Sequence, residues 1–563
     1  MERAIVAGAI GNCVHVAGVL GFLDVAEDLG YRTEFLGAAV PVSAFVEAIK
    51  QHDPEIVGVS YRLTPEVAEP LLAELRAKLE AEGLADRRFV FGGTPPVCKV
   101  AEQLGWFERC FSGLENPQDV WAYLDADRCP ESSEVKGDTC IARLNGKRRY
   151  PLLRHHFGLP SLEKTVAGVR KIAKSGVVDV ISIAPDQNAQ ESLFRPDEMD
   201  PKLDGAGGVP VRTRDDLLRI YRAGRRGNYP LLRIYSGTRD LVKWAELATE
   251  TINNAWGAIP LCWYSSLDGR SKRTPSRAIR ENQEAMRWYG ERCIPVEVNE
   301  SHHWSMRDAH DTIAVVMAYL AAYNAKKMGV SHYIAQYMFN SPPMTYGAMD
   351  LAKMLAKMQL IGTLHDDRFA TYRQVRAGLL HLSPRPNIAK GQLSASTMLA
   401  VQLKPDIIHV VGYCEGDHAA TPEDVIESCE IVHGALRNSL IGMPDMTIDP
   451  LVRERKDELL SEARVLLAAI QSLGNGDSDP FACPRLLAHA IKTGILDAPQ
   501  LRGNTFATGT VRTKVIDGAV YAVDPLTKRV LSESERLCML PGFSRRPKRL
   551  RASVQLTGSK GGM

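Results

Sequence analysis

Residues 4–18 have the sequence AIVAGAIGNCVHVAG, an apolar run followed by a short polar break and a run of small residues. The apolar run has no alternating polar positions, which favours a parallel strand buried on both faces. Similar runs recur at 56–60 and 89–93, separated by helical patterns such as TPEVAEPLLAELRAKLEAEG at 64–83. This alternation predicts a doubly wound α/β domain over residues 1–125.

Downstream, residues 126–150 are polar and lack sustained periodicity, which predicts a linker. Strand and helix patterns then alternate about eight times between 151 and 474, which is typical of a (β/α)8 TIM barrel. Thr274-Pro275 and Thr421-Pro422 predict helix starts, because threonine caps a helix and proline presets its first turn. Predicted strands include VVDVISIA at 177–184, MLAVQL at 398–403 and IIHVVG at 407–412.

The C-terminal region changes character after residue 474. A helical pattern, LLAHAIKTGILDAP at 486–499, precedes TVRTKVIDGAVYAVDP at 510–525, which has the pattern of a hairpin. We expect a small α+β C-terminal domain over 475–563. Its basic run SRRPKRLR at 544–551 favours a solvated tail over a nucleic-acid-binding arm.

Composition narrows the function. The 69 Lys and Arg against 67 Asp and Glu give a net charge of +2, which removes a general electrostatic case for nucleic acid or an anionic membrane as partner. No apolar run is long enough for a membrane span, and the first residues lack a cleavage site. The 11 cysteines form no C-x-x-C pair, which suits reduced thiols. We expect a cytoplasmic metabolic enzyme with a small-molecule substrate.

The segment Cys13-Val14-His15-Val16-Ala17-Gly18 follows the first predicted strand, where ligands bind in open parallel sheets. It resembles the D-x-H-x-x-G signature of cobalamin-binding domains, which are flavodoxin-like and use this histidine as the lower ligand of cobalt. The resemblance implies that His15 ligates cobalt and that the following residues also contact the cofactor: Cys13, Gly18, Ser60, Gly92, Gly93 and Thr94. Cys13 stands where the family has aspartate, and a thiol is a weaker partner for a metal-bound imidazole. Either this weakens ligation by His15 or Asn12 supplies the contact.

From about His156 onward the chain resembles the catalytic subunit of glutamate mutase, with the cobalamin subunit fused in front. The closest blocks include VRTRDDLLRIYRAG at 211–224 and DIIHVVGYCEGDHAATPED at 406–424. This resemblance implies a barrel capped by the corrin, adenosylcobalamin as cofactor with methylcobalamin as the alternative, and a homodimer. It also implies that Glu415 contacts the ribose of the adenosyl group and that Glu300 belongs to the pocket.

The same resemblance points to a different substrate. The three arginines that clamp glutamate in the family fall near His156, Gln190 and Tyr235, its catalytic glutamate near Ala255, and its adenosine-binding lysine at Val411. None of these residues supplies a bidentate cationic fork, so glutamate should bind too weakly to be the substrate. Candidates to restore one charge are Arg195, Arg233 and Arg239.

The sequence therefore predicts an adenosylcobalamin-dependent carbon-skeleton mutase acting on a small substrate other than glutamate. His156, Gln190, Tyr235 and Glu300 are expected to bind substrate, and His302 belongs to an imidazole-rich mouth able to act as acid or base near pH 7. A second metal site at His302, His303 and His310 is not expected, because their spacing is not H-E-x-x-H. Cys414 fits a buried structural thiol better than a nucleophile. The alternatives are a corrinoid methyltransferase and a non-catalytic cobalamin sensor or carrier.

Overall fold

The computed structural model describes residues 3–115, 117–125, 137–146, 150–235, 237–378, 381–474, 476 and 478–541. The chain divides into two compact units, residues 1–134 and 135–563, each with its own apolar core. The basic run 544–551 lies outside the described residues. So do residues 126–136 and 147–149 of the predicted linker.

The first unit is a parallel sheet with strand order β2-β1-β3-β4-β5. Its strands are β1 Ala4–Ala9, β2 Arg32–Phe35, β3 Ile56–Tyr61, β4 Arg88–Gly93 and β5 Arg109–Phe111. Its helices are α1 Ala17–Asp28, α2 Val42–His52, α3 Pro65–Ala81, α4 Pro95–Leu104 and α5 Pro117–Asp125. Every residue of β1 and β3 is buried, and separate apolar clusters cover the two faces of the sheet. The predicted α/β fold with parallel strands is confirmed.

The second unit contains a nearly closed parallel barrel with strand order β8-β7-β6-β13-β12-β11-β10-β9. Its strands are β6 Leu152–Phe157, β7 Val180–Ile183, β8 Leu231–Ile234, β9 Gly257–Ile259, β10 Val296–Val298, β11 His332–Tyr337, β12 Ala370–Ala377 and β13 Ile407–Val410. At the seam, β8 is joined to the residues just before β9 by hydrogen bonds from Ala255 N–H to Leu232 O at 2.9 Å and from Ile234 N–H to Asn254 Oδ1 at 3.1 Å. The predicted barrel is confirmed in this nearly closed form.

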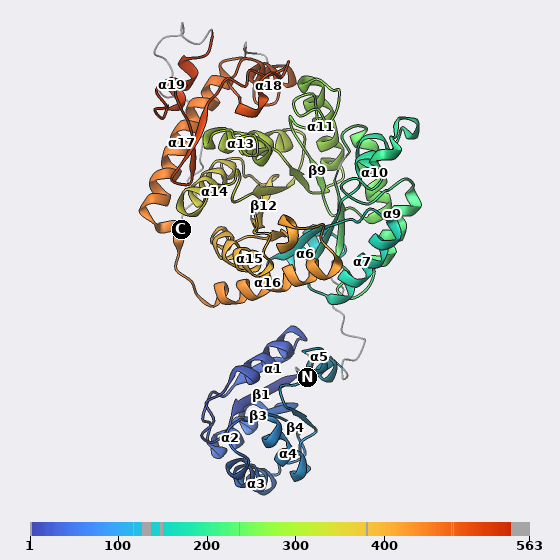
Figure 1. Ribbon diagram of the computed structural model, residues 1–563, viewed down its shortest axis with the longest axis vertical. Helices are drawn as coiled ribbons and strands as arrows, with labels where there is room; N and C mark the ends of the chain where they lie inside the picture. Colours follow the sequence, from blue (N-terminus) through green and yellow to red (C-terminus); the bar gives the residue numbers. More distant parts are fainter. Residues whose placement is uncertain are drawn as a thin grey trace. The chain divides into compact units, whose positions relative to one another are not determined.

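Helices surround the barrel strands (Figure 1). They are α7 Leu162–Ser175, α8 Gln187–Ser192, α9 Arg214–Gly224, α10 Leu241–Ile252, α11 Pro275–Gly290, α12 Ser301–Ser305, α13 Asp311–Lys327, α14 Gly347–Gly362, α15 Pro386–Ala400 and α16 Pro422–Ile441. Short 3-10 turns are η2 Pro196–Glu198, η3 Pro201–Leu203, η4 Val401–Leu403 and η5 Tyr413–Gly416. Thr274 and Thr421 cap α11 and α16 as predicted. The predicted strand 398–403 is wrong, because these residues form the end of α15 and η4.

Within the segment assigned to the linker, residues 137–146 include a helix, α6 Cys140–Asn145, capped by Thr139. Cys140 and Leu144 are buried against the first residues of the barrel strands, including Leu152, Val180 and Ile407. The Arg143 guanidinium also bonds to the backbone oxygens of Gly137 and Tyr229. This part of the segment covers the amino-terminal end of the barrel with an apolar layer.

Residues after α16 pack on the barrel unit. They form η6 Met446–Ile448, α17 Pro450–Gln471, α18 Pro484–Lys492, η7 Pro499–Leu501, the antiparallel strands β14 Thr513–Ile516 and β15 Ala519–Ala522, and α19 Glu533–Cys538. Helix α17 lies against α13 and α14, and α18 lies against α11. The C-terminal elements therefore share the barrel's core. None of the helices in the described parts of the chain has the length and apolarity to cross a bilayer.

Candidate functional site

The carboxyl edge of the first sheet brings together the residues predicted to contact a cofactor. His15 is exposed in the loop after β1, and Gly18 is exposed in the first turn of α1. Ser60 near the end of β3 is directly opposite Gly92 in β4, and Thr94 precedes α4. A Cβ at Gly92 would meet only Ser60 within 4 Å, whereas one at Gly93 would lie 2.7 Å from Tyr61 O. This edge is the ligand crevice of a doubly wound sheet.

Cys13, and not Asn12, is the neighbour of the His15 ring. The Cys13 thiol is fully buried, and its Sγ lies 3.9 Å from His15 Nδ1. Asn12 Oδ1 instead accepts a hydrogen bond from Tyr61 OH at 2.9 Å. His15 Nε2 bonds to no described residue, so the imidazole is free to meet a ligand from solvent. The arrangement fits an imidazole ligand with a weak thiol partner.

A small effect is expected from Cys13→Ala. A thiol at 3.9 Å is a weak hydrogen-bonding partner, so its loss should lower cobalamin affinity about threefold or less, whereas outer carboxylates are typically worth 10–100-fold. Titration of the purified chain with aquocobalamin, followed by absorbance, measures this. A loss of 100-fold would show that Cys13 orients His15 as strongly as a carboxylate does.

The interior of the barrel is polar and charged. Arg154, Arg233 and Glu297 are each 0 % exposed. Glu297 Oε1 lies 3.1 Å from an Arg233 terminal nitrogen, and Oε2 lies 3.7 Å from Arg154 and accepts from Trp256 Nε1 at 2.6 Å. Arg154 also donates to Ser182 Oγ at 2.6 Å and to Gln374 Oε1 at 2.8 Å. One carboxylate thus faces two buried guanidinium groups.

A second group of side chains lies toward the carboxyl ends of the strands. We call it the mouth cluster, and it consists of His156, Tyr235, His302, Arg376 and His409. The His156 ring stacks on Tyr235 with centroids 5.2 Å apart and meets the His409 ring edge-on at 4.8 Å. His156 Nε2 lies 2.8 Å from an Arg154 terminal nitrogen and 3.2 Å from Tyr235 OH. Since arginine can only donate, Nε2 accepts and the His156 ring is neutral.

The histidines of the mouth cluster are poor acids and bases at neutral pH. Burial, followed by the charges of Arg154 and Arg233, holds the pKa of His156 well below its usual range. Burial and Arg154 do the same to the pKa of His409, and burial with Arg376 lowers the pKa of His302 to about 3. The acid or base role expected for an imidazole here is therefore not supported by its surroundings.

Acid should destabilise the protein partly through His302. Its pKa is lowered in the folded state, so below about pH 6.5 the unfolded chain takes up a proton that the folded chain does not. Stability should therefore fall as the pH drops from 6.5 toward 3. Urea midpoints measured from pH 7 to pH 4 should fall less steeply for His302→Asn than for the unmodified protein. Parallel curves would contradict the lowered pKa.

Arg376 is the residue that sequence reasoning missed. It lies near the end of β12, is 7 % exposed, and forms no hydrogen bond or ion pair with a described residue; its Nε is buried without a partner. Burial lowers its pKa, while Glu415 and Tyr235 oppose this, so both lie within electrostatic reach. The arginines considered as replacements are occupied: Arg195 pairs with Asp240, Arg233 with Glu297, and Arg239 with Glu198.

The remaining predicted residues have other contacts. Glu300 is fully buried; its Oε2 accepts from Leu261 N and Cys262 N at 2.8 and 3.0 Å, and its Oε1 accepts from Trp304 Nε1 at 2.8 Å. These bonds tie the loop after β9 to α12, which is a structural use of the carboxylate. Gln190 Nε2 donates to Pro185 O at 2.8 Å. Glu415 is exposed on η5.

Comparison with known proteins identifies the first unit. Residues 3–110 match the B12 binding domain family. A novel cobalamin-binding protein from Desulfitobacterium hafniense DCB-2 is 32 % identical over 19 % of this chain and 52 % of its own, with a TM-score of 0.18. The cobalamin-dependent S-adenosylmethionine radical enzyme OxsB aligns over 87 % of this chain and 70 % of its own at 11 % identity, also with a TM-score of 0.18.

The family match shows that the first unit contains a B12-binding domain, which supports cobalamin binding by this part of the chain. The chain spans about half the length of the Desulfitobacterium protein.

Proposed function

We propose that the protein is an adenosylcobalamin-dependent carbon-skeleton mutase of the glutamate-mutase type whose barrel rearranges a small substrate carrying a carboxylate. The observation that carries this proposal is Arg376, a buried guanidinium that bonds to no described residue, at the mouth of a barrel that shares its chain with a B12-binding domain. Burying a guanidinium without a directly bonded carboxylate costs several kcal/mol, so a ligand carboxylate that bonds to it reduces that penalty.

The substrate class follows from the charges around the mouth cluster. Arg154, Arg233 and Arg376 are cationic, Glu297 is the carboxylate that the first two contact, and the imidazoles are neutral. A guanidinium binds a carboxylate through two parallel N–H donors. Arg376 supplies one such fork, whereas the glutamate-mutase pattern has three arginines. A single carboxylate, not the two of glutamate, fits this site.

The neutral imidazoles favour hydrogen-atom transfer over acid–base chemistry. Bound adenosylcobalamin supplies a 5′-deoxyadenosyl radical, and neither abstraction nor return of a hydrogen atom needs a group that titrates near pH 7. His156 and Tyr235 present a stacked, flat surface against which an uncharged part of the substrate can pack. In this proposal Glu415, which is exposed and within electrostatic reach of Arg376, contacts the ribose, and His15 ligates cobalt.

An anaerobic substrate screen tests this function. The protein loaded with adenosylcobalamin is mixed with small carboxylic and amino acids, each beside its neutral amide, and electron paramagnetic resonance is recorded. We expect a low-spin Co(II) signal with a carboxylate and none with its amide. Absence of any signal across the panel, with tighter binding of methylcobalamin than of adenosylcobalamin, would favour the methyltransferase alternative. His15→Ala is the control for cofactor loading and should lose the histidine-ligated spectrum.

A further inference from the structure

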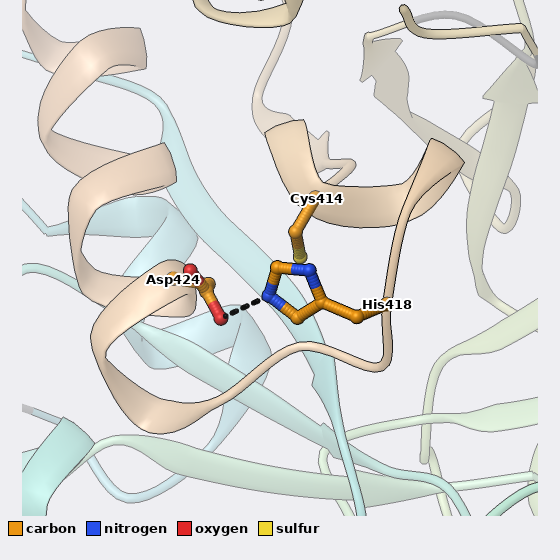
Figure 2. Close-up of side chains that lie close together, drawn as sticks. All are labelled: Cys414, His418 and Asp424. Carbon is orange, nitrogen blue, oxygen red and sulfur yellow. Dashed lines mark hydrogen bonds and ion pairs between the residues drawn. The ribbon is translucent and has the colours of Figure 1, made fainter. Parts of the chain in front are cut away.

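A second group of metal-ligating side chains lies in the barrel unit, in the loop between β13 and α16. Cys414 is in η5, His418 follows in the loop, and Asp424 is in the first turn of α16. One ligand atom from each lies within 4.8 Å of the other two. Figure 2 shows the His418 ring between the Cys414 sulfur and the Asp424 carboxylate. We propose that Cys414, His418 and Asp424 bind a divalent transition-metal ion of the zinc class.

His418 is held as metal-bound histidines are. Its Nδ1 lies 2.8 Å from Asp417 Oδ2, and its Nε2 lies 3.1 Å from Asp424 Oδ2. A carboxylate on the far ring nitrogen fixes the orientation of a ligating imidazole and raises its basicity. Two ligands of one tetrahedral zinc ion, each about 2.0–2.1 Å from it, are separated by about 3.3 Å, so His418 and Asp424 already have nearly the required spacing.

The carboxylate ligand is also fixed in advance. Asp424 Oδ2 accepts from Thr421 N at 2.9 Å and Thr421 Oγ1 at 2.6 Å, while Oδ1 accepts from Tyr413 OH at 2.8 Å. Cys414 is 3 % exposed, so its sulfur faces protein and is not lost to solvent. Thiolate, imidazole and carboxylate together are a donor set that suits zinc better than calcium or magnesium.

An independent observation in the barrel points to the same place. His155 in β6 is 4 % exposed; its Nδ1 bonds to His156 O at 2.6 Å, which leaves Nε2 as a bare acceptor, and Nε2 has no partner. A Cβ at Gly412 would lie 3.2 Å from Cys414 Sγ and 3.3 Å from His155 Nε2, so both atoms border the space that the glycine leaves open. His155 is therefore the candidate fourth ligand.

Such an ion would crosslink elements of the barrel unit. It would join η5, which includes Glu415, to the start of α16 and to β6, and so fix the loop beside the mouth cluster. Metal binding itself does not depend on the mutase proposal, because every ligand named here belongs to the barrel unit.

Metal titration of the cobalamin-free, untagged full chain tests the site. After chelator treatment we expect one Zn²⁺ per chain with a dissociation constant of about 1 µM or tighter. Co²⁺ in its place should give the intense visible bands of a tetrahedral site and a sulfur-to-cobalt charge-transfer band in the near ultraviolet. Cys414→Ser should abolish the charge-transfer band, and His418→Ala should weaken Zn²⁺ binding about 100-fold. Asp417→Asn should weaken it about 10-fold.

Matched controls separate ligation from general damage. Cys429→Ala and His433→Ala alter a thiol and an imidazole of α16 outside the cluster and should leave Zn²⁺ affinity unchanged. Because His418 is exposed, its variant should fold, which circular dichroism verifies. A Zn²⁺ dissociation constant of about 100 µM or weaker for the unmodified chain would overturn the proposal. So would Zn²⁺ affinities of Cys414→Ser and His418→Ala equal to that of the unmodified chain. Either result leaves the radical test of the mutase unaffected.

Discussion

Replacing Glu297 by glutamine is expected to lower the free energy of unfolding of the barrel by about 3–5 kcal/mol. Glu297 is the carboxylate in contact with both Arg154 and Arg233, and all three side chains are 0 % exposed. The amide keeps the shape of the side chain but leaves two guanidinium groups in the interior without a counter-charge. A single lost surface ion pair would cost about 1 kcal/mol or less.

Urea unfolding followed by tryptophan emission measures this, since Trp256 Nε1 donates to Glu297 at 2.6 Å and reports on its surroundings. Glu250→Gln, which removes the exposed partner of Arg214, is the matched control and should change the midpoint little. Adding Arg233→Met to Glu297→Gln should recover part of the loss, because one uncompensated charge is then removed. A midpoint for Glu297→Gln equal to that of the control would contradict the ionic account.

Replacing Arg376 by methionine is expected to lower kcat/KM for a carboxylate substrate by about 30- to 5000-fold, equivalent to ~2–5 kcal/mol for a lost buried charged contact. The same change should leave the free energy of unfolding unchanged or raise it, because the guanidinium has no partner in the described structure. A loss of activity without a loss of stability distinguishes a residue that binds the substrate from one that stabilises the fold.

Arg376→Lys should retain part of the activity, since the charge remains but the bidentate fork is lost. Arg373, on the same strand, donates to Leu403 O at 2.7 Å and is the matched control. Arg373→Met should lower stability with little effect on kcat/KM. The role of Arg376 would be refuted if its methionine variant kept full activity toward the carboxylate, or if it lost stability as Arg373→Met does.

Strands with an apolar sequence were easier to predict than the strands that line the barrel interior. Strands β1 and β3 are buried on both faces, so their sequences have an uninterrupted apolar pattern. Strands β6, LLRHHF, and β12, ATYRQVRA, have arginine, histidine and glutamine at alternating positions directed into the barrel. This polar pattern is not that of a strand with an apolar buried face. The apolar run 398–403 does have a strand-like pattern, but it belongs to the end of α15 and to η4.

Single residues show the same division. The position of His15 in the loop after β1 could be predicted from the chain, because it depends on a local spacing after one strand. Glu300 could not be interpreted in this way, because its carboxylate is occupied by Leu261, Cys262 and Trp304 only when β9 and β10 lie side by side. Arg376 has no local motif. That no described residue bonds to it depends on how segments far apart in the chain pack around it.

The sequence by itself thus predicted the parallel α/β architecture, the presence of a barrel and a candidate cofactor-binding edge around His15, because apolar periodicity and short motifs are local properties. The tertiary structure decided which charges are paired. It paired Arg233 with Glu297 and Arg239 with Glu198, and it left Arg376 buried without an ion pair among the described residues. It also gathered Cys414, His418 and Asp424 beside His155. The physical reason is that the energy of a charge depends on its distance to other charges and to water, and only the folded barrel sets those distances.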